Sequence, residues 1–146
     1  MNQTSLNALI DLATEKRDAA ASALGKLRGQ HDQARAQLEA LKEYRAEYRQ
    51  RLDRNMADGI SMSRLDNDQR FLAALDEAIE QQGRVVNDNV NRLAAGQDQW
   101  RDRQRRLKSF DALSARRAEA QAKQELRQEQ QQNDEAAGRS ARRATG

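Results

Sequence analysis

Residue types that often carry chemistry are sparse in this sequence. His31 is the only histidine and there is no cysteine, so a zinc or thiolate site would have too few ligands. No Glu-x-x-His pair is present to build a metal site inside a helical bundle. We therefore expect no metal and no cofactor, and we interpret His31 as a histidine packed at a helix interface.

Two further patterns could be taken for catalytic or nucleotide-binding groups. Glu39, Glu43 and Glu47 form an i,i+4 row of carboxylates, but basic residues surround this row and nothing predicts an enclosing pocket. The pair Gly25-Lys26 lacks the glycine spacing and the preceding strand of a phosphate-binding loop. We predict that the protein is not an enzyme.

The strongest local charge excess is in residues 101–108, with five basic residues and one acidic. In the helix pairing described below it lies near Asp11, Glu15 and Asp18, whose carboxylates can balance it. Contact with an acidic partner is the alternative. Nucleic acid would require interleaved aromatic residues or a groove-reading motif, and only Trp100 is near, so we expect no nucleic-acid partner.

The composition predicts an elongated all-α protein. Of 146 residues 37% are hydrophobic and 34% charged, and the mean hydropathy of −1.09 is too low for a compact core. The absence of proline favours long helices. The net charge of +3 is small beside 26 basic and 23 acidic residues that alternate along the chain. Without a signal peptide or a long apolar segment, we expect a soluble, cytoplasmic protein.

Two heptad repeats predict a long antiparallel coiled coil of two helices. The first repeat, in residues 4–57, spaces its a and d positions from Leu6 to Leu52, and the second, in residues 62–130, repeats a large apolar residue every seven positions from Leu65 to Leu107. One register fits throughout if the numbers of facing residues add up to about 120. It places Trp100 beside Ala20, pairs His31 with Asn89, and sets Arg17 opposite Arg103, whose side chains must reach outward to water.

Local signals mark the ends of the two helices. Asp58-Gly59 ends the first helix, residues 58–61 form the turn, and Ser63-x-x-Asp66 has the form of a capping box for the second. Beyond Arg116 the apolar period fades, so we expect an unpaired helical overhang to about residue 130. Residues 131–146 form a separate segment that we expect to be a frayed, disordered tail.

Aromatic residues gather near the turn. Three of the five, Tyr44, Tyr48 and Phe71, lie there, and in the heptad frame they share one side of the hairpin with neighbouring g and d positions. We predict that this side binds a partner, because aromatic side chains outside a helix interface are common anchors. Alternatively, the rings only widen the interface near the turn. The residues of this tip surface are Gln37, Leu41, Tyr44, Tyr48, Phe71, Leu75, Ala78 and Gln82.

The tip also carries a family resemblance. The sequence Leu-Lys-Glu-Tyr-Arg-Ala-Glu-Tyr-Arg at 41–49, the turn Gly-Ile-Ser at 59–61 and the segment from Phe71 to Gln82 resemble the flagellar FliJ family of type III export proteins. Trp100 and residues 107–113 match as well. The resemblance runs from about Leu6 to Arg117.

This resemblance implies a coiled coil similar to the central stalk of rotary ATPases. It implies three partners, namely the hexameric flagellar export ATPase, the cytoplasmic region of the export gate and export chaperones. The expected location is the cytoplasmic face of the inner membrane at the flagellar base, reached through protein partners only, and the expected process is flagellum biogenesis for motility. The alternative is a generic structural or nucleic-acid-associated coiled coil.

Overall fold

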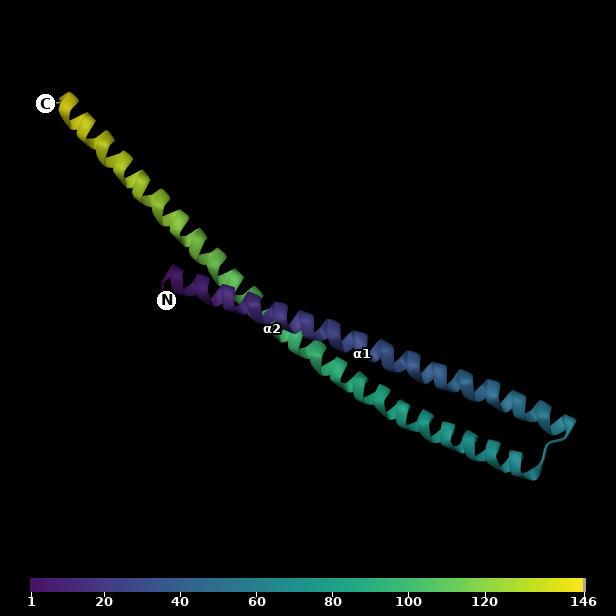
Figure 1. Cartoon of the computed structure of the whole chain (residues 1–146). Coiled ribbons are helices and arrows are strands. Elements are labelled where there is room, and N and C mark those ends of the chain that lie inside the picture. Colours follow the sequence, from purple (N-terminus) through teal and green to yellow (C-terminus); the bar gives the residue numbers. More distant parts are fainter. Residues whose placement is uncertain (146) are drawn as a thin grey trace. The chain divides into compact units, whose positions relative to one another are not determined.

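The computed structural model describes residues 1–145, which form two α-helices and no strand. Helix α1 spans Gln3–Asp58 and helix α2 spans Met62–Thr145. The two helices pack against each other in antiparallel directions (Figure 1), which confirms the predicted all-α hairpin. Neither α1 nor α2, within the described residues, contains a segment long and apolar enough to cross a membrane.

Both helices begin at a polar capping residue. The side-chain Oδ1 of Asn2 accepts a hydrogen bond of 2.7 Å from the Ser5 backbone N–H, and Ser61 Oγ accepts one of 3.2 Å from the Arg64 backbone N–H. The predicted capping box at Ser63 is therefore wrong. Because α2 begins at Met62, the residue in the capping position is Ser61.

A glycine ends α1, as predicted. The last helical residue is Asp58, and Gly59 follows with φ of 96°, a left-handed conformation that costs glycine little. The Gly59 N–H donates a hydrogen bond of 3.3 Å to the carbonyl of Met56. This bond closes the last turn and lets the chain reverse toward α2.

The chain divides into two compact units, and each contains a part of both helices. The tip unit comprises Asp18–Asp102, and the terminal unit comprises Met1–Arg17 together with Arg103–Gly146. In both units every a and d position of the two predicted heptad repeats, from Leu6 to Leu52 and from Leu65 to Phe110, is buried or half-buried. The heptad frame is therefore confirmed.

The core of the tip unit lies next to the turn. Leu52, Leu72 and Leu75 are buried together, and three partly buried side chains pack against them. These three are Tyr48, Ile60 and Leu65. Farther from the turn, Gly96 faces Leu24 and Leu27, whose numbers add up with it to about 120, as in the predicted register. Ala20 is buried and Trp100 half-buried.

Gly96 differs from the other glycines inside the helices of the tip unit. A Cβ atom built at Gly25, Gly29 or Gly83 would meet nothing within 4 Å, whereas one at Gly96 would lie 2.6 Å from Leu27 Cδ1. Inside a helix any glycine costs about 1 kcal/mol relative to alanine, whatever surrounds it. The structure shows that Gly96 also makes room for a side chain of the facing helix.

The terminal unit has a buried helix interface of its own. Leu6, Ala13 and Leu107 are buried there, and the Arg117 guanidinium donates a hydrogen bond to the carbonyl of Met1. Arg17 and Arg103, predicted to share the interface, are both half-buried. Within the terminal unit, the interface between α1 and α2 therefore includes the start of α1.

Beyond Arg117, α2 has no helix beside it. Every residue from Ala118 to Thr145 is exposed, apart from the half-buried Gly138. The helix runs on to Thr145 instead of ending near residue 130, because no proline interrupts it and two arginines in its last turn suit the negative end of the helix dipole. Gly146 lies outside the described residues, and the fraying of residues 131–146 in solution stays a prediction.

Candidate functional site

The eight residues of the tip surface all belong to the tip unit and differ in exposure. Tyr44 and Phe71 expose 43% and 38% of their surface, whereas Leu75 exposes 8% and belongs to the core. Gln37 is exposed as well. The remaining four, Leu41, Tyr48, Ala78 and Gln82, are half-buried. The exposed part of the tip surface therefore consists mainly of two aromatic rings and one amide.

Three aromatic rings from the two helices contact one another. Phe71 of α2 lies against Tyr48 of α1 with ring centroids 4.6 Å apart, and it meets Tyr44 nearly edge to face at 6.2 Å and 85°. The Tyr44 and Tyr48 rings are 6.4 Å apart. Such tilted pairs contribute about 0.5–1.5 kcal/mol each beyond the area that they bury. The cluster thus holds the exposed rings in place across the helix interface.

The hydroxyl of Tyr48 anchors this cluster to α2. It donates a hydrogen bond of 2.6 Å to Asp68 Oδ1, and this bond raises the pKa of Tyr48 above its ordinary value. The Tyr48 ring also lies under the Arg51 guanidinium, 5.5 Å from its centroid. The ring of Tyr48 therefore packs in the helix interface, and its hydroxyl group binds Asp68 of α2.

At the other end of the tip surface, a side-chain amide joins the two helices. The Gln82 side-chain amide donates to the backbone carbonyl of Ala34 at 3.0 Å and to Gln37 Oε1 at 3.2 Å. Gln37 and Gln82, which the sequence predicts on one surface, are thus in direct contact. This contact fixes how α1 and α2 align along the tip surface.

An ion pair that the heptad pattern alone does not predict also crosses the interface. The Arg45 guanidinium donates to both carboxylate oxygens of Asp76. These bonds lower the pKa of Asp76 and raise that of Arg45. A signal for this pair was present, because Arg45 occupies an a position, where a charged side chain needs a partner on the facing helix.

The carboxylate row of α1 lies open to solvent. Glu39 is 3.9 Å from Lys42, and Glu47 lines only a shallow depression with Gln50, Arg51 and Arg54. His31 is half-buried, with its Nδ1 3.7 Å from Asp32. No group of three acidic, histidine or cysteine side chains in residues 1–145 is arranged to hold a metal ion. Glu39 and Glu47 therefore lie on an open surface of α1, without a metal ligand group around them in residues 1–145.

Comparison with known proteins agrees with the resemblance carried by the tip. The family model described as "Flagellar FliJ protein" matches residues 1–146. A flagellar FliJ protein of Salmonella typhi is 36% identical over 138 residues, covering 94% of both chains. The namesake protein of Escherichia coli (strain K12) is 35% identical over 138 residues, again 94% of both chains. None of these names indicates catalysis. The chain belongs to the flagellar FliJ family.

Proposed function

We propose that this protein is a non-enzymatic coiled-coil stalk of the flagellar type III export apparatus. It binds the hexameric export ATPase through its terminal unit and the cytoplasmic region of the export gate through the tip surface. In this way it couples the ATPase to the gate and to export chaperones. It reaches the cytoplasmic face of the inner membrane at the flagellar base through these proteins. Family membership supports the flagellar role, and the two units support the division of partners.

The single observation that carries the gate-binding role is the exposure of the aromatic cluster. Tyr48 packs against the buried leucines of the tip unit, but Tyr44 and Phe71 do not belong to that core and keep much of their surface in solvent. If the rings only widened the helix interface, all three would be expected to pack against the core. Aromatic side chains that are exposed and fixed in place are suitable anchors for a partner.

The ATPase-binding role is supported by charge. The terminal unit contains 13 basic and 8 acidic residues, a net charge of +5, whereas the tip unit contains 13 basic and 15 acidic residues, a net charge of −2. Electrostatic attraction favours the insertion of a basic segment and its exposed helical overhang into a channel lined by acidic residues. A shallow groove of the same unit adds apolar surface from Leu9, Leu12 and Phe110.

Replacing both Tyr44 and Phe71 by alanine tests the gate-binding role. We expect binding of the purified cytoplasmic region of the gate to weaken by at least tenfold, while helicity measured by circular dichroism and stimulation of the ATPase persist. The control replaces Val85 and Val90, which are exposed to 47% and 46% in the same unit but lie outside the tip surface. A parallel loss of helicity would assign the rings to the core instead.

Truncation after Arg117 tests the ATPase-binding role. We expect it to weaken stimulation of the purified ATPase. Exchange for glutamate of Arg105 and Arg106 in the terminal unit, together with Arg101, which precedes that segment by two residues, should do the same. A triple exchange at Arg70, Arg84 and Arg92 in the tip unit changes the net charge equally and is the control. Full stimulation by the truncated chain and the first triple variant would contradict the proposal. Salt-labile recovery of nucleic acid in place of the ATPase would favour the alternative function.

A further inference from the structure

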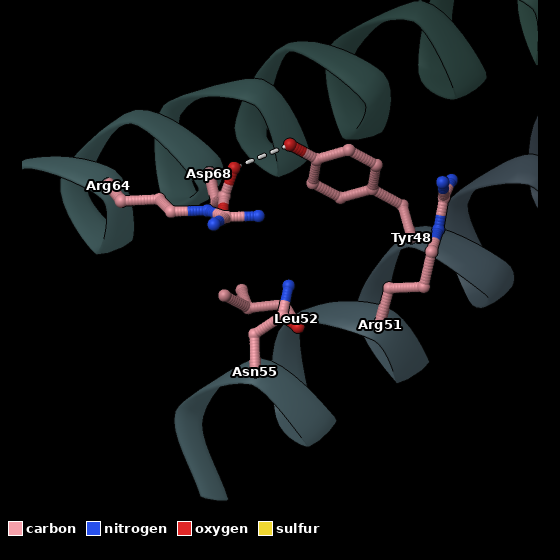
Figure 2. Close-up of a pocket in the computed structure, with 6 residues that line it drawn as sticks. All are labelled: Tyr48, Arg51, Leu52, Asn55, Arg64 and Asp68. Atoms are coloured by element: carbon pink, nitrogen blue, oxygen red, sulfur yellow. Dashed lines mark hydrogen bonds between the residues drawn. The ribbon is translucent and has the colours of Figure 1, made fainter. Parts of the chain in front are cut away.

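A small pocket lies between the last turns of α1 and the first turns of α2, next to the tip surface (Figure 2). Its volume is about 130 Å³. The buried Leu52 gives it an apolar wall, and the remaining side chains bring two guanidinium groups, an amide, a hydroxyl and a carboxylate. These side chains belong to Tyr48, Arg51, Asn55, Arg64 and Asp68.

The two arginines of this pocket keep their charges available. Within residues 1–145 no carboxylate lies within ion-pair distance of Arg51 or Arg64, because most acidic side chains near the turn have other partners. Asp68 accepts the hydroxyl of Tyr48. The other pairs are Asp53 with Arg49, Asp66 with Arg70 and Asp76 with Arg45. With two cations and one occupied carboxylate, the pocket has an excess of positive charge.

The pocket continues the tip surface toward the turn. Arg51 follows Tyr44 by seven residues on α1, and Arg64 precedes Phe71 by seven on α2, so all four occupy g positions along the same side of the hairpin. The exposed rings and the two guanidinium groups therefore form one strip. Along each helix the distance between ring and arginine is about 10 Å, at 1.5 Å per residue.

We infer that the pocket of Arg51 and Arg64 binds a carboxylate side chain of the protein segment whose apolar residues dock on Tyr44 and Phe71. The inference rests on the proposed function of the tip surface, and the occupant is a segment of the cytoplasmic region of the export gate. Arginine forks bind carboxylates with paired hydrogen bonds, and the first turn of α2 adds the positive end of its dipole. If the segment is helical, its apolar anchor and its acidic residue are about seven positions apart.

Exchange of both arginines for glutamine, R51Q/R64Q, tests this inference in the full-length chain. The probe is the purified cytoplasmic region of the gate, and the dissociation constant is measured at low and at high salt. We expect binding to weaken by about tenfold or more at low salt, since hydrogen bonds to charged groups are among the stronger ones, and the difference from wild type to shrink as salt rises. Helicity should remain unchanged because both side chains are exposed.

The matched control is R49Q/R70Q, which removes the same charge from two exposed arginines that are paired within their own helices. It should change binding by less than about twofold. If R51Q/R64Q binds like this control while Y44A/F71A has lost binding, the carboxylate pocket is refuted and gate binding by the tip surface stands. If the wild-type chain does not bind the gate region, both the gate-binding role and the pocket's assignment to it are refuted.

Discussion

Substitution of alanine for Gly96 should have two opposing effects on stability. The helix propensity of α2 improves, but the new methyl group clashes with a side chain of α1. At Gly83 a new methyl group meets nothing within 4 Å, so the exchange should raise the free energy of unfolding by about 0.5–1 kcal/mol through helix propensity alone. At Gly96 the methyl group would lie 2.6 Å from Leu27 Cδ1 and 3.6 Å from Leu24 Cδ1. Leu27 would then have to move by about 1 Å to restore an ordinary carbon–carbon contact of about 3.5–4.0 Å.

This displacement should cancel or reverse the gain in helix propensity. A strained rotamer costs about 0.5–1.5 kcal/mol and overpacking of an interface about 1–3 kcal/mol. We therefore expect Gly96→Ala to be less stable than Gly83→Ala by at least about 1 kcal/mol, as measured by urea unfolding followed by circular dichroism. With Leu27 first shortened to alanine, Gly96→Ala should recover the full gain. If Gly96→Ala stabilises the wild-type chain as much as Gly83→Ala does, the close approach of Leu27 to Gly96 is refuted.

Three further predictions follow from the turn, the tip and the overhang. Gly59→Ala should cost about 1–2 kcal/mol in urea unfolding because its φ of 96° is strained for alanine, whereas Gly25→Ala should stabilise the chain. Because the folded-state pKa of Asp76 is lowered, its pair with Arg45 stabilises the fold fully above the ordinary carboxyl pKa and is lost as pH falls through the lower value. Wild type should thus unfold at higher urea than Asp76→Asn at neutral pH, and this advantage should vanish near pH 2, where a persistent difference would contradict the pair. Amide hydrogen exchange should be fast from Ala118 onward, because this part of α2 packs against no other helix. For the same reason, truncation after residue 130 should leave the unfolding free energy unchanged. Slow exchange of this segment in the isolated chain would show that it is packed after all.

The sequence predicts the fold well because a heptad repeat records which side of each helix is buried. From Leu65 to Leu107 one large apolar residue recurs every seven positions, and each of them is buried or half-buried. The register could be predicted as well, since the alignment that pairs Tyr48 with the first turns of α2 also brings Gln82 beside Ala34 and Gly96 beside Leu24. Side-chain volume and periodicity are properties of the sequence alone.

Other features depend on atoms that periodicity does not describe. Ser61 and Ser63 are both plausible caps by residue type, and only the position of the first helical residue decides between them. The pair of Arg45 with Asp76 depends on side-chain reach across the interface. The end of α2 at Thr145 could not be predicted from packing, because residues beyond Arg117 have no facing helix and their helicity reflects local propensity.

The contacts among Tyr44, Tyr48 and Phe71 have a consequence for the energetics and lifetime of a complex. A side chain that becomes ordered on binding loses rotamer entropy, at about 0.5–1.5 kcal/mol for each flexible one. Here each exposed ring is already braced by its neighbours before any partner arrives. Little entropy would then be lost on docking, and more of the contact energy would oppose dissociation. A variant that keeps all three rings but removes an anchor of the cluster, such as Tyr48→Phe, which loses the hydrogen bond to Asp68, should therefore shorten the lifetime of the complex more than it slows its formation.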